Sequence, residues 1–289
     1  MRPLDLLIGA LFAGAIALAA RRTHALTTGG ALAAFAVGTV TYASGTLGFT
    51  FVLLAFFVPS VVLSRVGKRR KRALVDIGKA GARDAMQVLA NGGVATLCAA
   101  AWAFTYDVRW AAAFAGAYAA ATADTWGTEI GTLARGAPRS IVTGKRVPAG
   151  ISGGITRAGS LAEAAGAAWL ALAGTAGIAV AYALGSRGHA TIWAFGEPAT
   201  AIGLVAGGIA LGGVAGALVD SLLGASLQEL RFCDACGRSC ETDPHVCGAP
   251  TRLMRGVRGV SNDAVNLLAT LAGAAVAFAL AAEAAITSR

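Results

Sequence analysis

The sequence predicts an all-α integral membrane protein: one domain over residues 1–289, built as a polytopic bundle of about eight transmembrane helices. Of its 289 residues, 56% are hydrophobic and only 13% are charged, whereas a soluble domain is about 25% charged. Apolar segments recur along the whole chain, and a helix needs about 20 such residues to cross the hydrocarbon core. The 39 glycines favour close helix packing in lipid.

The first apolar segment is expected to be a retained helix. Its arginine pair, Arg21 and Arg22, follows the apolar run, whereas a cleaved signal peptide carries its positive charge in front.

The motifs described below lie in or beside the long connections 65–87, 124–160 and 223–263. The eight expected spans are 4–20, 25–43, 47–64, 88–106, 109–123, 161–184, 199–222 and 264–283.

The Lys and Arg residues predict the orientation of these spans. Twenty of the 24 fall in the first, third, fifth and seventh connections. The positive-inside rule places those connections in the cytoplasm and both termini outside, as expected for a plasma or inner membrane of bacterial type. This topology explains the net charge of +9 without nucleic acid as a partner. The run 68–72 (KRRKR) would also attract anionic lipid.

Three aspartates, Asp124, Asp220 and Asp263, lie where spans meet the cytoplasmic side, in the motifs 123–129 (ADTWGTE), 219–221 (VDS) and 261–266 (SNDAVN). Ionisable groups at this depth are costly and are commonly functional. Oxygen ligands suit Mg²⁺, which assists phosphoryl or nucleotidyl transfer. Each Asp alone could instead cap a helix, but three on one side favour a catalytic Mg²⁺ site. Further candidate ligands are Glu129, Asn91, Asn262 and Asn266.

Small residues precede two of these aspartates at intervals of four. Gly208, Gly212 and Gly216 lead to Asp220, and Gly116 with Ala120 leads to Asp124. Small residues at this spacing allow close helix contact in lipid. We therefore expect both carboxylates to face protein.

A Gly/Ser-rich loop over 143–157 (TGKRVPAGISGGITR) is a candidate phosphate cradle, with Lys145, Ser152, Gly153 and Gly154 as its binding residues. Exposed backbone N–H groups and a cation can bind an anion, although such a loop is commonly just a flexible connection. A helix is expected to begin near Ser160, with Glu163 in capping-box spacing.

Lys79 and Arg83 form a second basic pair. If they lie on a helix, they are one turn apart and could both reach a diphosphate. The alternative reading is ordinary cytoplasmic charge that sets the topology.

The cytoplasmic stretch 223–263 contains Cys233, Cys236, His245 and Cys247, with Cys240 as a spare thiol. Tetrahedral zinc uses this ligand set in small loops that lack a core, and a cytoplasmic location disfavours disulfides. The pattern predicts a structural zinc site. Cys98, inside a span, is expected to be a small core residue.

Together these motifs resemble the integral-membrane family long labelled domain of unknown function ninety-two, which includes animal transmembrane protein nineteen and the plant plastid phytyl-phosphate kinase. The matching elements run in the family's order over about residues 79–270. They are 87–93 (QVLANGG), 123–131, 147–154, 216–228, the Cys/His loop ending at 245–248 (HVCG), and 261–266.

The resemblance implies a membrane kinase that transfers a phosphoryl group from CTP, or another nucleoside triphosphate, to an isoprenyl or phytyl monophosphate held in the membrane. The motif order is also similar to that of dolichol kinases and CTP-dependent phosphatidate cytidylyltransferases. By that likeness Asp124, Asp220 and Asp263 would hold Mg²⁺, and Lys145 with 152–154 would hold the donor phosphates. The alternatives are a CTP-dependent nucleotidyltransferase that makes a CDP-lipid, and a non-enzymatic lipid or ion transporter.

Overall fold

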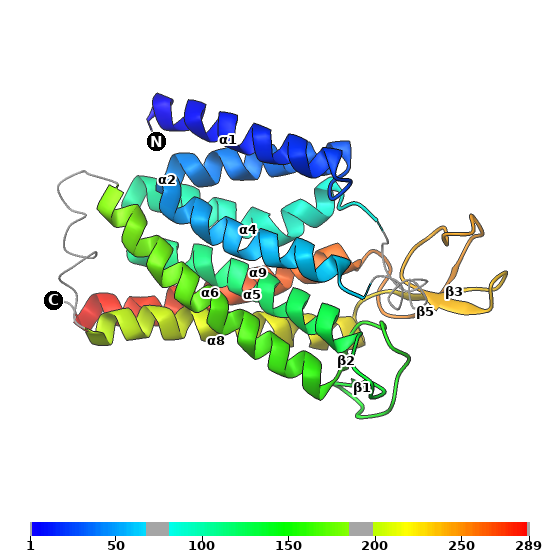
Figure 1. Ribbon diagram of the computed structural model, residues 1–289. Coiled ribbons are helices and arrows are strands. Elements are labelled where there is room, and N and C mark those ends of the chain that lie inside the picture. Colours follow the sequence, from blue (N-terminus) through cyan, green and yellow to red (C-terminus); the bar gives the residue numbers. More distant parts are fainter. Residues whose placement is uncertain (1, 68–80, 185–198, 288–289) are drawn as a thin grey trace.

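The computed structural model describes residues 2–67, 81–184 and 199–287, and it confirms the all-α membrane bundle (Figure 1). Within α2, Gly45 and Thr46 have non-helical backbone angles, so this long helix is two segments joined at a kink. Counted this way, the described chain has eight helical segments, as the sequence predicts. The helices are α1 (Pro3–Arg22), α2 (Thr28–Arg65), α4 (Ala85–Thr105), α5 (Val108–Gly131), α6 (Arg157–Leu184), α8 (Ala199–Ser226) and α9 (Asn262–Thr287).

Six of these helices are long and apolar enough to cross a membrane, and α5 is the one that is not among them. The position of α5 in the bundle explains why it need not be as apolar as the others. Every residue of α5 from 111 to 123 is buried, and α5 packs against α4, α6, α8 and α9. Because other helices surround it instead of lipid, α5 can be built largely from alanine and can carry Asp124 and Glu129.

Close contact between α5, α8 and α9 depends on glycine. A Cβ added at Gly216 would lie 2.3 Å from Cβ of Ala120, and one at Gly116 would lie 2.6 Å from the carbonyl oxygen of Gly273. A Cβ at Gly212 would lie 2.5 Å from that same oxygen. No larger residue fits at these positions without moving a helix. The small-residue faces expected from the sequence are therefore the faces along which these helices pack.

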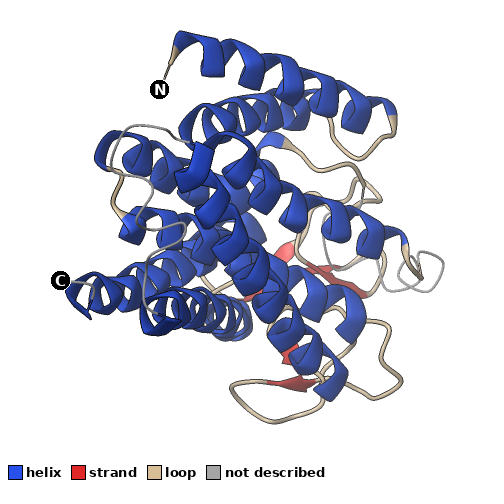
Figure 2. Cartoon of the chain, turned by 60° about the vertical axis from the view of Figure 1, so that its left-hand side comes forward, coloured by secondary structure: helices blue, strands red, loops and turns tan. Residues whose placement is uncertain are grey.

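Both described ends of the chain lie at one end of the bundle, and the long connections lie at the other (Figure 1). We call the latter the loop end; it carries the connections 23–27, 132–156 and 227–261, and the described residues 66–67 and 81–84. The strands are short and belong to these connections (Figure 2). Antiparallel β1 (Arg139–Ser140) and β2 (Gly154–Ile155) form one pair, and β3 (Leu230–Cys233) lies between β4 (Arg238–Cys240) and β5 (Arg252–Arg255).

Two helices extend further than expected towards the loop end. α5 runs to Gly131 and α8 to Ser226, so Asp124 and Asp220 lie inside helices and not at their ends. The close contact of α5 with α6 continues through these extra turns, since a Cβ at Gly127 would lie 2.5 Å from Glu163 Cγ and one at Gly131 would lie 3.2 Å from Thr156 Oγ1. Because these extra turns are packed and not exposed to water, they keep both carboxylates inside the protein.

One local expectation was wrong, and the condition set for a second reading is not met at Arg83. Helix α6 begins at Arg157, and the Thr156 hydroxyl accepts a hydrogen bond from Gly159 N, so Ser160 with Glu163 is not its capping box. Arg83 precedes α4, which begins at Ala85 behind a capping box made by Asp84 and Gln87. Arg83 is therefore not on a helix, because the cap requires extended backbone at Asp84. Lys79 lies outside the described residues.

Candidate functional site

Four carboxylates from four elements converge at the loop end, and we call them the acid cluster: Asp124 on α5, Glu163 on α6, Asp220 on α8 and Glu241 just after β4. The Asp124 and Asp220 side chains share a hydrogen bond. Glu163 interacts electrostatically with both of them, and Glu241 with Asp220. Glu129, one turn further along α5, adds a further negative charge near Asp124.

Tight packing of α5 against α6 brings Glu163 to the cluster. A Cβ at Gly127 would lie 2.5 Å from Glu163 Cγ, so only glycine leaves room for that side chain. One turn away, a Cβ at Gly159 would lie 3.0 Å from the carbonyl oxygen of Gly127. The missing side chains of these two glycines let the helices approach and place Glu163 beside Asp124.

Within the acid cluster, the Asp124 and Asp220 pair is the part that could hold a cation. Among the described residues, Oδ2 of buried Asp220 has no hydrogen-bond partner. Like charges held this close repel each other, and they persist only with a shared proton or a neutralising cation. Carboxylate oxygens are the ligands Mg²⁺ prefers. When a cation takes the place of their shared proton, Asp124 and Asp220 would supply its first two oxygens.

Glu241 is a member of the site that the sequence did not predict. Its Oε1 accepts hydrogen bonds from the hydroxyl of Ser152 at 2.6 Å and from Ser152 N at 3.3 Å. Burial raises the pKa of Glu241 to about 7, and the hydrogen bonds from Ser152 act in the opposite direction. The carboxyl therefore exchanges its proton near neutral pH. In the sequence, the only signal for Glu241 is its position directly after Cys240, inside the Cys/His stretch.

Arg255 supplies the neighbouring positive charge. Its Nη2 donates to the carbonyl oxygen of Gly224 at 3.0 Å, near the C-terminus of α8, and its charge acts on Glu241. A cation at this position also stabilises the negative end of the α8 dipole. Arg255 was counted in the sequence only as topological charge.

The Gly/Ser-rich loop is fastened to the end of α8. Gly153 has φ +77°, and a Cβ there would lie 2.4 Å from Ala225 N, so both the backbone angle and the contact require glycine. Ser152 N donates to Glu241, and Gly154 N donates to the carbonyl oxygen of Ile151 at 3.1 Å. Lys145 is exposed in the turn between β1 and β2. Its role in holding phosphate, like that of residues 152–154, remains a prediction.

The third predicted aspartate, Asp263, lies on α9 and is not one of the four carboxylates of the acid cluster. Asp263 is buried in the first turn of α9, which packs against both α5 and α8. Asn262 is exposed at the start of α9, and Asn266 is half-buried one turn further on. The Thr270 hydroxyl donates to the carbonyl oxygen of Ala90 at 3.1 Å and so joins α9 to α4. Asp263 therefore shares the loop end with the acid cluster.

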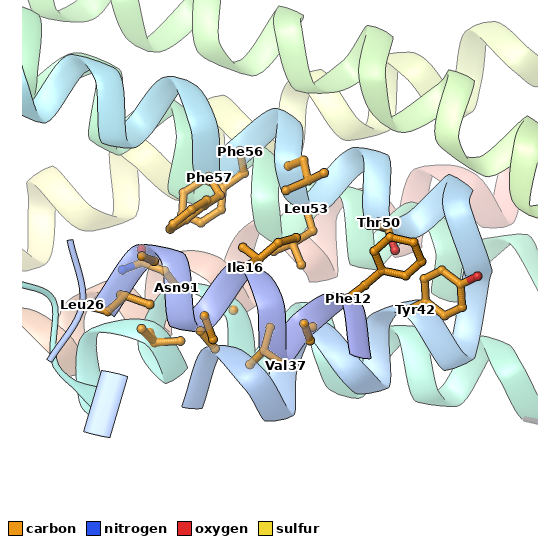
Figure 3. Close-up of a pocket in the computed structure, with 18 of the residues that line it drawn as sticks. Phe12, Ile16, Leu26, Val37, Tyr42, Thr50, Leu53, Phe56, Phe57 and Asn91 are labelled. Atoms are coloured by element: carbon orange, nitrogen blue, oxygen red, sulfur yellow. The ribbon is translucent and has the colours of Figure 1, made fainter. Parts of the chain in front are cut away.

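An apolar groove lies among the first helices of the bundle (Figure 3). It lies between α1, both halves of α2 and α4, and holds about 860 Å³ of space, part of it open to the surroundings. Phe12, Ile16, Leu53 and Phe57 are among its apolar lining residues (Figure 3). Its polar lining residues include Arg83, Gln87 and Asn91.

Arg83 lines the groove and interacts electrostatically with Glu129. Its backbone is held by Ala25 and Thr27, with Arg83 N donating to Ala25 O and Thr27 N donating to Arg83 O, each at 3.0 Å. Burial lowers the pKa of its guanidinium, and the charge of Glu129 acts against that shift. Since Glu129 also acts on Asp124, the lining of the groove and the carboxylates belong to one electrostatic network.

The predicted zinc ligands also lie together. One ligand atom from each of Cys233, Cys236, His245 and Cys247 falls within 4.8 Å of the others, the one such His/Cys/Asp/Glu group in the described part of the chain. Cys240 is directed elsewhere, with Sγ 3.6 Å from the carbonyl oxygen of Thr242. Cys98 is buried within α4, as expected.

Comparison with known proteins places this architecture in a family. The model of the family described as integral membrane protein DUF92 matches residues 11–274. The chain is 30% identical to Protein PGR of Arabidopsis thaliana over 284 residues, 92% of each chain. It is also 30% identical to the uncharacterized membrane protein MJ0933 of Methanocaldococcus jannaschii over 270 residues, 93% of this chain and 91% of that one. No solved structure matches. The chain thus belongs to the DUF92 family of integral membrane proteins.

Proposed function

We propose that the protein is a membrane kinase that transfers the terminal phosphoryl group of CTP, or another nucleoside triphosphate, to an isoprenyl or phytyl monophosphate. The acid cluster carries this proposal, because four carboxylates meet at one end of an apolar bundle that also holds an apolar groove. Carboxylates used by a transporter are expected near the middle of the membrane instead.

The groove supports a lipid substrate. Its lining over α1 and α2 is almost wholly apolar, as expected of a site that holds a prenyl chain. A prenyl chain in the groove would place its phosphate near Arg83. The guanidinium can donate two parallel hydrogen bonds to phosphate, which fixes the orientation of the headgroup.

The proposed reaction needs no covalent enzyme intermediate. A terminal oxygen of the lipid monophosphate attacks the γ-phosphorus of the nucleotide and forms the new P–O bond. The bond to the oxygen that bridges the β- and γ-phosphorus breaks, and the nucleoside diphosphate leaves with the electron pair. The enzyme contributes mainly position and charge neutralisation.

Particular residues would make those contributions. Asp124 and Asp220 would hold Mg²⁺, with Asp263, Glu129 and the predicted asparagines as further ligands. When bound there, Mg²⁺ supplies neutralisation of charge on the nucleotide phosphates. Arg83 would orient the acceptor phosphate, and Lys145 would approach the donor phosphates from the Gly/Ser-rich loop.

Product analysis tests the reaction. The purified protein in lipid nanodiscs is incubated with Mg²⁺, geranylgeranyl or phytyl monophosphate, and CTP labelled at either the α- or the γ-phosphorus. We expect γ-label in a lipid diphosphate, with α-label remaining in CDP. An α-labelled CDP-lipid with release of pyrophosphate would show nucleotidyl transfer instead. Absence of transfer from any nucleoside triphosphate to any prenyl monophosphate would refute both enzyme assignments.

Filling the groove should impair use of long lipids. Ala17 of α1 is buried and lines the groove, so Ala17→Phe would occupy space meant for the chain. We expect KM for geranylgeranyl monophosphate to rise about 10-fold, equivalent to about 1.4 kcal/mol. A five-carbon prenyl monophosphate, which needs little of the groove, should be affected much less.

The matched control is Leu18→Phe, since Leu18 is the next residue of α1, is 50% exposed and does not line the groove. Initial rates measured over a series of chain lengths compare the two variants. An equal loss for short and long substrates in Ala17→Phe would place the lipid chain elsewhere.

A further inference from the structure

The stretch between α8 and α9 has the geometry of a metal site built from two turns. Cys233 Sγ and Cys247 Sγ are 3.7 Å apart, and His245 Nδ1 is 3.0 Å from Cys247 Sγ. Sulfur ligands 2.3 Å from a tetrahedral zinc lie about 3.8 Å from each other. The ligand atoms of three thiols and one imidazole, all within 4.8 Å of one another, match a closed structural zinc set.

The backbone presents these ligands in two similar turns. Gly237 and Gly248 follow Cys236 and Cys247, and both have positive φ, +64° and +84°. Gly237 N donates to the carbonyl oxygen of Cys233 at 2.9 Å, and Gly248 N donates to that of His245 at 2.8 Å. Each turn therefore holds two of the ligands, Cys233 with Cys236 and His245 with Cys247. Glycine is the residue best suited to the left-handed position that follows each pair.

We call the connection 227–261 the Cys/His unit. Apart from the four Cys and His ligands, few contacts stabilise this unit. Its sheet has three strands, of at most four residues each, with alternating burial in β3 and mostly exposed residues in β5. Its interior polar contacts centre on buried Arg231, which binds Glu229, Asp243 and Thr251. A unit with so little apolar core is typical of domains whose folding depends on a bound metal.

The same unit supplies Glu241 to the acid cluster and Arg255 as a positive charge that acts on Glu241. Glu241 directly follows β4 and accepts hydrogen bonds from Ser152. Arg255 ends β5 and donates to the carbonyl oxygen of Gly224 on α8. Gln228, at the base of the unit, donates to the Ser152 hydroxyl at 2.9 Å. The position of Glu241 and the anchoring of the Gly/Ser-rich loop therefore depend on how this unit folds.

We propose that Cys233, Cys236, His245 and Cys247 bind one zinc ion, and that this zinc holds the 227–261 connection in the fold that places Glu241 against Ser152. The zinc is structural, because all four of its positions are filled by protein ligands. The inference does not rest on the proposed kinase activity. It concerns the assembly of the loop end, whatever reaction occurs there.

Metal content tests the first half of the proposal. We expect elemental mass spectrometry of the purified full-length protein in nanodiscs to find about one zinc per chain. In the double variant Cys236→Ser/Cys247→Ser, the zinc content should fall at least 10-fold. Cys240→Ser is the matched control in the same unit, and it should retain the metal. A chain without zinc, a chain holding iron in its place, or equal loss in Cys240→Ser would overturn the assignment.

Hydrogen exchange tests the second half on protein that is already folded. Zinc is removed from the wild type with a membrane-permeable chelator, and exchange is followed in peptides covering Ser152 and, as a reference, the buried stretch 111–123 of α5. We expect the Ser152 amide to exchange at least 10-fold faster without zinc, while the α5 peptide is unchanged. Loss of zinc with unaltered exchange at Ser152 would refute the link between the metal and the loop.

Discussion

Asp124→Asn should lower phosphoryl transfer by about 10²–10³-fold, the typical cost of removing one preorganised group that stabilises transition-state charge. The substitution keeps the shape of the side chain but replaces an anionic oxygen with an amide donor, so the pair with Asp220 can no longer bind Mg²⁺ with two carboxylates. The rate of γ-label transfer at saturating substrate measures the loss. Asp220→Asn should have an effect of similar size.

The control for this prediction lies on the same helix. Asp107 caps α5 at the opposite end of the bundle, where its Oδ1 accepts from Arg109 N at 2.9 Å. Asn is an equally good N-cap residue, so Asp107→Asn should leave both folding and turnover close to wild type. Transfer at the wild-type rate in Asp124→Asn, with intact protein, would remove Asp124 from the metal site.

Gly216→Val should destabilise the bundle by about 1–3 kcal/mol or more, the range expected for overpacking a close-packed interior. A Cβ at Gly216 would lie 2.3 Å from Cβ of Ala120 and 2.8 Å from the carbonyl oxygen of Ala269. The added side chain would push α8 away from both α5 and α9. Because Asp220 lies one turn beyond Gly216, the same displacement should separate it from Asp124 and reduce Mg²⁺ binding.

Gly207→Val is the matched control for this substitution, because Gly207 lies on α8 and a Cβ there would meet nothing within 4 Å. Both variants introduce the same β-branched residue into one helix, so any difference between them reflects packing. Thermal unfolding in nanodiscs compares the two proteins. A Gly216→Val protein as stable as Gly207→Val would mean that α5 and α8 are not held by this contact.

Much of the architecture could be predicted from the sequence, because it follows from local composition. Apolar runs of sufficient length predict helices in lipid, and the bias of Lys and Arg predicts which connections lie together. The kink at Gly45 and Thr46 agrees with the predicted break between the spans 25–43 and 47–64. The faces carrying Gly216 and Ala120 were also predictable, since four-residue spacing places small residues on one side of a helix.

The composition of the site was only half predictable. Asp124 and Asp220 stand out because a carboxylate in an apolar helix is rare in any sequence. Glu163 and Glu241 do not stand out, since one resembles a helix cap and the other an ordinary loop residue. Their place in the acid cluster depends on the close approach of α5 and α6 at Gly127 and on the path of the chain after β4.

By itself, then, the sequence of this protein determined the membrane bundle, the grouping of the motif connections at one end, two aspartates of the acid cluster, and the Cys and His residues that the structure brings together. Each of these follows from a pattern within one segment. The tertiary structure alone decided that Glu163 and Glu241 join those aspartates, that Arg83 lines a groove, and that the Cys/His unit holds the Gly/Ser-rich loop. These contacts link residues far apart in the chain, and they arise from the packing of helices and loops, which no local pattern encodes.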